Sequence, residues 1–212
     1  MKIYEREADY KMKKISRKLS LILFAIVLLG TSYTGGGTAD AATGNQGYAA
    51  YRDGVFFGFD WHAGLWDEPA SNYGLPILHA PGTGKSVQWD TWSNFIDGNN
   101  FKGTYRPNTA PSSAQRDLFV AMGRNLRTQN ISYNLGYQVY YSTGSASTYV
   151  KYDEVSSMRC DGVIEYIYEW YSFRVYGNDT QWDVTKNDFW IREQHSGTLI
   201  TPKKQVNYLT AI

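Results

Sequence analysis

The chain has 212 residues, of which 42% are hydrophobic and 19% charged, and its formal net charge is +1. This length suits one globular domain with a core of its own. The first 42 residues carry seven Lys or Arg and four Asp or Glu, so the rest holds 14 basic and 16 acidic residues. Because that remainder is slightly acidic, the composition argues against a dedicated nucleic-acid binder, which needs a basic face.

The N-terminal segment is typical of an export signal. Basic residues between Lys11 and Lys18 precede an apolar stretch, residues 19–30, which is too short to span a bilayer comfortably. Ala39-Asp40-Ala41 follows the small-x-small pattern of a cleavage site. We expect residues 1–41 to be a removed signal peptide, residues 42–212 to form one domain, and the protein to be secreted or cell-wall associated. The alternative is an uncleaved anchor; after processing we expect no stable membrane span.

Apolar runs and turn-forming runs alternate along the rest of the chain. The expected elements are, in order, a flexible start at 43–50, a strand or hairpin at 55–66, a loop at 67–74, a strand at 75–80, a turn at 81–84, a strand leading into a helical turn at 86–95, a turn at 97–100, a helix at 113–130 and strand-like sequence at 131–152 with a hairpin tip at 142–147. Leu118, Met122 and Leu126 share one face of the expected helix. The tail at 174–212 has no clear periodicity. These elements predict one α+β domain.

Cys160 is the only cysteine, so it cannot form an intramolecular disulfide or a Cys-based zinc site. It is either a reactive thiol or a buried small hydrophobe. From Asp161 onward apolar residues recur at helical spacing, and Ser156, Ser157 and Asp161 offer helix-start chemistry. We therefore expect Cys160 at a helix N-terminus, where the helix dipole favours a thiolate. Gly162 then permits close approach of another strand or of a substrate.

A cysteine hydrolase also needs a base and a polar group that orients the base. His62 lies within the strand-like run at 55–66, and His79 ends the strand expected at 75–80. Adjacent antiparallel strands place two such side chains on one face, so that one ring acts as base and the other as orienter. The alternatives are two structural histidines, or a metal pair completed by Asp60 or Asp90. No HExxH-type spacing supports a metal, and we expect neither metal nor cofactor.

Four segments of the chain resemble the NlpC/p60 cysteine peptidases. RCDGVIEYIYEW at 159–170 resembles their nucleophile helix, which usually begins Asp-Cys-Ser-Gly. WHAGLW at 61–66 resembles their base strand, usually His-Val-Gly-Ile-Tyr, and ILHAPGTGKSVQW at 77–89 is similar to the following strand and turn. NISYNL at 130–135 resembles their Gly-x-Pro-Tyr segment. Together the matches span residues 50–171.

The resemblance implies a papain-like fold, with a small antiparallel sheet or partial barrel packed against helices. By position, Cys160 is the nucleophile, His62 the general base and His79 the third, orienting residue. Tyr133 matches the tyrosine that lines the active site and helps the oxyanion hole. His195 matches nothing in the family and is expected to be structural.

Two departures from the family pattern bear on function. Both histidines precede the cysteine, which is the order of the circularly permuted branch, where peptidases, amidases and lipid acyltransferases all occur. A triad is defined by geometry and not by chain order, so permutation leaves the chemistry intact. Arg159 stands where the family usually has Asp, and Asp161 where it has Ser. We expect these two residues to shape the substrate pocket.

The resemblance predicts an exported cysteine hydrolase that cleaves amide or peptide bonds through a Cys-His-His triad and a thioacyl-enzyme. Peptidoglycan-derived peptides are the expected substrate. One alternative is an acyltransferase or lipid hydrolase of the permuted branch. Another is a non-catalytic module on the same scaffold that binds glycan or peptide with its 18 Tyr and 7 Trp residues.

Overall fold

The structure, a computed structural model, describes residues 44–55, 60–67, 74–141, 150–176 and 200–212. Contacts divide the chain into Met1–Gly37 and Thr38–Ile212, and every described residue belongs to the second unit. The expected signal peptide and its cleavage site, the hairpin tip at 142–147 and His195 lie outside the described residues. Within the described ranges, no helix combines the length and the apolar character that crossing a membrane requires.

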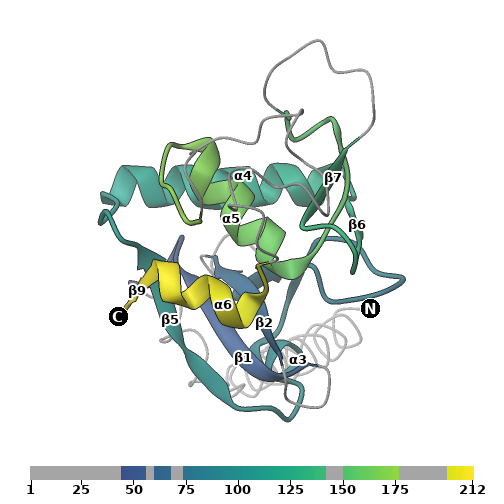
Figure 1. Cartoon of the computed structure of the whole chain (residues 1–212), viewed down its shortest axis with the longest axis horizontal. Coiled ribbons are helices and arrows are strands. Elements are labelled where there is room, and N and C mark those ends of the chain that lie inside the picture. The colour runs from purple at the N-terminus through teal and green to yellow at the C-terminus, as the bar shows by residue number, and fades with distance from the viewer. Residues whose placement is uncertain (1–43, 56–59, 68–73, 142–149, 177–199) are drawn as a thin grey trace, which may run out of the picture. The chain divides into compact units, whose positions relative to one another are not determined.

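The expected α+β class is confirmed, and its main element is a six-stranded sheet (Figure 1). The strand order is β4-β3-β2-β1-β5-β9, and every neighbouring pair is antiparallel. The strands are β1 (Ala49–Val55), β2 (Asp60–Trp66), β3 (Ile77–His79), β4 (Gln88–Asp90), β5 (Phe101–Pro107) and β9 (Leu209–Ala211).

A second, three-stranded sheet and the helices complete the described fold. The sheet has the order β6-β8-β7, and β6 runs parallel to β8. Its strands are β6 (Ser132–Tyr133), β7 (Val139–Tyr141) and β8 (Val155–Met158). The helices are α3 (Trp92–Ile96), α4 (Ser113–Thr128), α5 (Cys160–Trp170) and α6 (Pro202–Gln205), with the 3-10 turn η4 (Val206–Tyr208) after α6.

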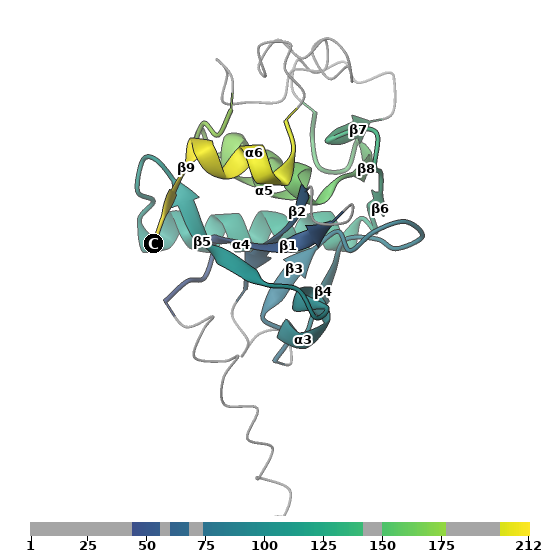
Figure 2. The same ribbon diagram turned by 60° about the horizontal axis from the view of Figure 1, so that its bottom comes forward.

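Alternation along the strands gives the six-stranded sheet two apolar faces. On one face Ala63 and Leu65 of β2 join the main core, to which α4 and α5 also contribute. On the other face Trp66 packs in a smaller cluster with Ile77 and with Phe95 of α3. Figure 2 shows α4, α5 and α6 on one side of the strands and α3 on the other. Odd-numbered residues of β2 therefore face α5, and even-numbered ones face α3.

The helix expected at 113–130 is confirmed at Ser113–Thr128 and begins with a capping box formed by Ser112 and Gln115. Its expected apolar face is wrong at Leu118, which is 46% exposed. The buried face instead runs through Phe119, whose ring packs 4.9 Å from that of Tyr168. The large aromatic side chain, rather than Leu118, takes the place in the core.

The sequence predicted β3, β4 and α3 within the correct ranges and missed β1, β5 and β9. Residues 43–50 were expected to be a flexible start, but Ala49 and Ala50 are fully buried and open β1. The end of the aperiodic tail forms β9, which pairs with β5 and so completes the sheet.

Candidate active site

Cys160 is the first residue of α5, as the sequence predicted, and is 4% exposed. The expected capping is wrong. Arg159 is the N-cap and makes no side-chain cap, and Ser156 and Ser157 lie in β8. The carboxylate of Asp161 accepts two hydrogen bonds from the Arg159 guanidinium instead. The helix start is therefore set by the strand that precedes it and by packing, not by a capping side chain.

Gly162 permits the close approach that its position predicted, and the approaching group is backbone from just before β7. A Cβ at Gly162 would lie 1.8 Å from the carbonyl oxygen of Gln138. The backbone N–H of Arg159 donates to the same carbonyl at 3.1 Å. The first turn of α5 therefore rests directly on the Gln138 backbone, which only a glycine at position 162 allows.

The thiol of Cys160 meets β2 at the backbone of Ala63. The N–H of Trp66 donates to the carbonyl of Tyr48, which directly precedes β1. Because N–H directions alternate along a strand, the N–H of Ala63, three residues earlier, points away from β1. On the other side β3 pairs with β2 only at Leu65 and Trp66. The Ala63 N–H thus points out of an unpaired edge of β2, and it lies close enough to the thiol to favour its ionised form.

Burial raises the pKa of Cys160 to about 12, and the nearby Asp161 carboxylate also raises it. The Ala63 N–H and the Arg159 charge act in the opposite direction but are outweighed. The prediction that the helix start favours a thiolate is therefore wrong for this state, because loss of hydration dominates. The thiol rests protonated.

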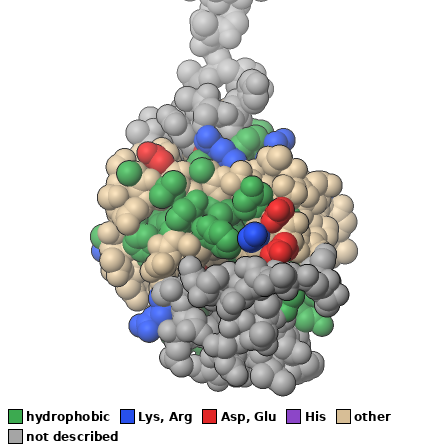
Figure 3. All heavy atoms as spheres, turned by 90° about the horizontal axis from the view of Figure 1, so that it is seen from above, with side chains coloured by type: hydrophobic (Ala, Val, Ile, Leu, Met, Phe, Trp, Pro, Cys, Tyr) green, Lys and Arg blue, Asp and Glu red, His purple; other side chains and the backbone are tan. Residues whose placement is uncertain are grey.

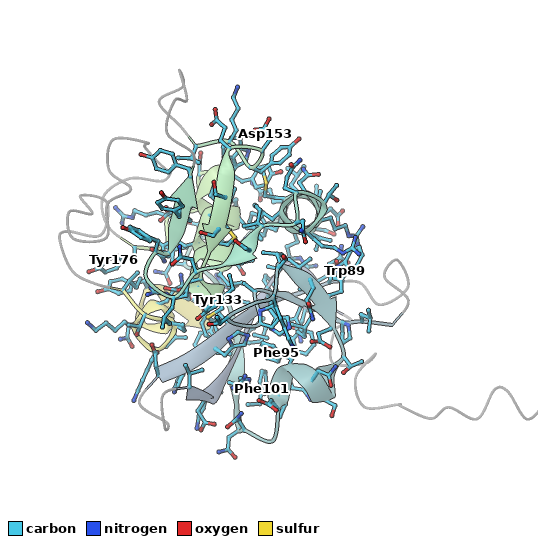
Figure 4. The ribbon with its side chains drawn as sticks, turned by 90° about the vertical axis from the view of Figure 1, so that its right-hand side faces the viewer. Trp89, Phe95, Phe101, Tyr133, Asp153 and Tyr176 are labelled. Carbon is cyan, nitrogen blue, oxygen red and sulfur yellow. The ribbon has the colours of Figure 1, made fainter. Side chains whose placement is uncertain are left out.

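The two histidines that the sequence singled out lie side by side. His62 Nε2 is 2.8 Å from His79 Nδ1, and the rings meet edge to face with centroids 5.1 Å apart. Antiparallel pairing of β2 with β3 puts them on one face, as expected. The Phe95 ring, labelled in Figure 4, packs with its centroid 5.6 Å from that of His62 and 5.4 Å from that of His79. Both imidazoles are buried, and Figure 3 shows no histidine on the face it presents.

Asp90 continues this line of side chains. Its Oδ2 lies 3.4 Å from His79 Nε2, because Asp90 pairs with Ile77 across β3 and β4 and so shares a face with His79. The sequence offered Asp90 only as a metal ligand and missed it as an orienting group. The signal that could have found it is a hairpin over residues 77–90 in which Ile77 pairs with Asp90, because that register puts His79 and Asp90 on one face.

The hydrogen bonds from His62 to His79 and from His79 to Asp90 fix the tautomers of both imidazoles. A carboxylate only accepts, so Asp90 requires the His79 proton on Nε2 and leaves His79 Nδ1 as an acceptor. His62 must then carry its proton on Nε2 to donate to His79. The lone pair of His62 is therefore on Nδ1, which makes Nδ1 the basic nitrogen of the group.

Both imidazoles rest neutral. Burial lowers the pKa of His62 well below 6.5, and the positive charges of a protonated His79 and of Arg52 would lower it further. Burial also lowers the pKa of His79, against the opposing effect of Asp90. Arg52 lies opposite His62 in β1 and donates to the Phe95 carbonyl. Sequence reasoning missed Arg52 because it missed β1.

The Cys160 thiol and the His62 ring approach β2 from opposite faces of the sheet, next to the part of β2 that β3 does not pair with. The His62 ring lies on the α3 side, and the thiol approaches Ala63 from the α5 side. Among the described residues, no hydrogen bond joins the Cys160 sulfur to His62. Proton transfer requires the sulfur and His62 Nδ1 to approach further, a tightening common when substrates bind to loose apo sites.

Tyr133 is half-buried in β6, beside the strand β8 that leads to Cys160. It pairs with Met158, two residues before Cys160. Burial raises the pKa of Tyr133, and the charge of an ionised Cys160 would raise it further. Its hydroxyl therefore stays protonated and able to donate a hydrogen bond.

Arg159 and Asp161, expected in substrate binding, contact each other at 2.6 and 2.7 Å. Asp161 is fully buried, and Arg159 also donates to the Ile200 carbonyl at 2.7 Å. The two charges thus satisfy each other and tie α5 to the C-terminal segment. Their role in binding substrate stays a prediction.

A groove of about 700 Å³ borders the start of β2 and the C-terminal segment. It is lined by Asp60, Trp61, Thr201, Lys203, Lys204, Val206 and Asn207. Trp61 has the same parity as Ala63, so the groove lies on the Cys160 side of the sheet. The carboxylate of Asp60, at one end of the groove, adds to the effects that raise the pKa of both Cys160 and Tyr133.

Across the described part of the chain, no three His, Cys, Asp or Glu side chains are grouped as metal ligands. Comparison with protein-family models, with curated proteins and with solved structures gives no match to this chain. What the site can do therefore has to be argued from its own geometry.

Proposed function

We propose that this protein is an exported cysteine hydrolase of papain-like, circularly permuted NlpC/p60 type, with Cys160, His62 and His79 as its triad. The observation that carries the proposal is the hydrogen-bonded line from His62 through His79 to Asp90, together with a helix-start cysteine whose thiol contacts the backbone of Ala63, the residue after His62. This line leaves one basic nitrogen, His62 Nδ1, for the thiol. An orienter of a base and a helix-start cysteine are the parts that nucleophilic catalysis by a thiol needs.

In the proposed reaction the Cys160 sulfur attacks an amide carbonyl carbon while its proton passes to His62 Nδ1. Because the resting thiol and imidazole are both neutral, attack and proton transfer occur together rather than from a preformed ion pair. The C–N bond breaks as His62 returns the proton to the leaving amine. Water, activated by His62, then hydrolyses the thioacyl-enzyme. The proposed oxyanion donors are the Ala63 N–H, which contacts the thiol, and the Tyr133 hydroxyl, whose pKa the charge of an ionised Cys160 would raise.

The groove between the start of β2 and the C-terminal segment offers contacts for a peptide substrate. Five of its seven lining side chains are polar or charged, and only Trp61 and Val206 are apolar. An extended peptide can hydrogen-bond to these polar groups, while Trp61, Val206 and the lysine stems give its side chains apolar contacts. With the export signal and the family resemblance, this favours peptidoglycan-derived peptides.

The buried thiol favours a second candidate, a non-catalytic module that binds peptide or glycan. Such a module keeps the scaffold but leaves Cys160 as a buried small hydrophobe, and burial raises the pKa of its thiol. The two candidates differ in one respect: only the hydrolase forms a covalent bond between Cys160 and its substrate.

The test incubates the mature protein with a peptidoglycan digest and follows the release of free amines. The hydrolase proposal requires release by the wild type, loss in Cys160→Ala and in His62→Gln, and retention in Ser157→Ala, a matched change in the strand before α5. Circular dichroism verifies that each variant folds. Equal release by Cys160→Ala and the wild type contradicts the proposal, and binding without release supports the module.

A further inference from the structure

The C-terminal segment reaches the first turn of α5 through one buried side chain. Gln205, the last residue of α6, is fully buried. Its Nε2 donates to the Asp161 carbonyl at 3.0 Å and to Glu165 Oε2 at 2.9 Å, while its Oε1 accepts from the Tyr51 hydroxyl at 2.7 Å. Both N–H groups and the oxygen of the amide are used, so the side chain has one defined orientation.

These bonds connect the two halves of the candidate site. Asp161 follows the nucleophile in α5, and Tyr51 lies opposite Ala63, whose N–H faces the thiol. Gln205 thus ties the helix that carries Cys160 to the strand pair that carries His62. A covalent connection between these halves runs through almost a hundred residues, whereas the path through Gln205 is a single side chain.

A second amide holds the same helix from its other side. Gln138 donates through Nε2 to Glu165 Oε2 at 2.6 Å, and its carbonyl accepts from the Arg159 N–H. Glu165 therefore receives bonds from two fully buried glutamines, one before β7 and one at the end of α6. Gln138 and Gln205 thus both hold α5, and Gln205 also bonds to β1 through Tyr51.

We propose that Gln205 is a positioning residue for the nucleophile, so that the C-terminal segment sets the separation between the Cys160 thiol and the base on β2. The proposal rests on the proposed function. Gln205 touches neither thiol nor imidazole, and acts through the Asp161 carbonyl and Tyr51. Removing its bonds loosens the first turn of α5, lets water reach the thiol and displaces it from the imidazole.

The test compares Gln205→Met, of similar size but without the donors, with Gln129→Met at the exposed end of α4. A displacement near 1 Å lowers turnover of the peptidoglycan digest by about 100-fold. We expect kcat to fall by this order in Gln205→Met with KM nearly unchanged. Alkylation of Cys160 by iodoacetamide should become faster, with a lower pH midpoint, because hydration lowers the thiol pKa. Gln129→Met should match the wild type in both assays.

The outcomes separate positioning from folding. Unchanged kcat in folded Gln205→Met overturns the proposal, as does a loss of turnover that only follows the unfolded fraction. Tyr51→Phe removes a single bond and should change kcat and alkylation in the same directions by smaller factors, so it keeps the test open if Gln205→Met does not fold. If the wild type releases no amine, the proposed function fails, and alkylation alone decides: equal rates in both proteins overturn the positioning role.

Discussion

Replacing Gly162 with alanine tests the packing that holds Cys160 in place. The added Cβ would lie 1.8 Å from the Gln138 carbonyl oxygen and 2.7 Å from its carbonyl carbon. These are backbone atoms, which cannot rotate away as the tip of a side chain can. The Arg159 N–H bonds to the same carbonyl, so relief of the clash also strains the helix start.

Two opposing effects set the size of the change. Alanine is favoured over glycine in a helix interior by about 1 kcal/mol. Overpacking a well-packed site costs about 1–3 kcal/mol, and so close a contact with backbone belongs at the upper end. We therefore expect Gly162→Ala to lower the free energy of unfolding by about 2 kcal/mol, although helix propensity alone predicts a gain.

Urea denaturation followed by circular dichroism measures this difference. With a slope of about 1–3 kcal/mol per molar urea, the midpoint should fall by about 1 M. Gly123→Ala is the helical control, because its Cβ would meet only the ends of the Leu78, Leu65 and Ile167 side chains, which can move. Gly136→Ala is the surface control, with its nearest atom at 3.5 Å. A Gly162→Ala protein as stable as the wild type would refute the packing described at α5.

Three further predictions concern the charges of the site. Alkylation of Cys160 by iodoacetamide should still be rising at pH 10, because burial raises the thiol pKa to about 12; a plateau near pH 9, as for a free thiol, would contradict this. Stability should fall as the pH drops below about 6.5, by up to about 1.4 kcal/mol per pH unit for each histidine, because the folded state keeps His62 and His79 neutral and binds fewer protons than the unfolded state. The loss should shrink in His62→Gln, and flat unfolding free energies between pH 7 and 5 would count against it. Asp90→Asn should lower the pKa of His79 and reduce turnover at least tenfold, because the ring loses the anion that fixes its tautomer. Asp97→Asn is the control, because Asp97 lines one cavity together with His79 and Asp90. Unchanged His79 NMR shifts in Asp90→Asn would exclude the contact.

The local features of the site were within reach of the sequence. Helical spacing after Asp161 predicted α5 with Cys160 at its start, and two successive strands predicted the contact of His62 with His79. Both depend on short-range periodicity, which a sequence displays directly. The contact of Asp90 with His79 needed only the register of the hairpin over residues 77–90.

The remaining features of the fold and of the site depend on contacts between residues that are distant in the sequence. Ala49–Val55 and Phe101–Pro107 mix polar, glycine and apolar residues, and become strands only by pairing with each other and with β2 or β9. Arg52 and Gln205 enter the site region through these pairings. The raised pKa of the thiol also escaped prediction, because it follows from burial by the whole core and not from the helix start.

The central claim, that Cys160 and His62 act together as nucleophile and base, is tested most directly by mass spectrometry of the enzyme itself. The wild type and His62→Gln are mixed with a peptidoglycan digest, quenched in acid within seconds and digested, and the peptide that carries Cys160 is weighed. The account predicts a thioacyl adduct on Cys160 in the wild type and its near absence in folded His62→Gln. An unmodified Cys160 during active turnover, or equal adduct in both proteins, would contradict it.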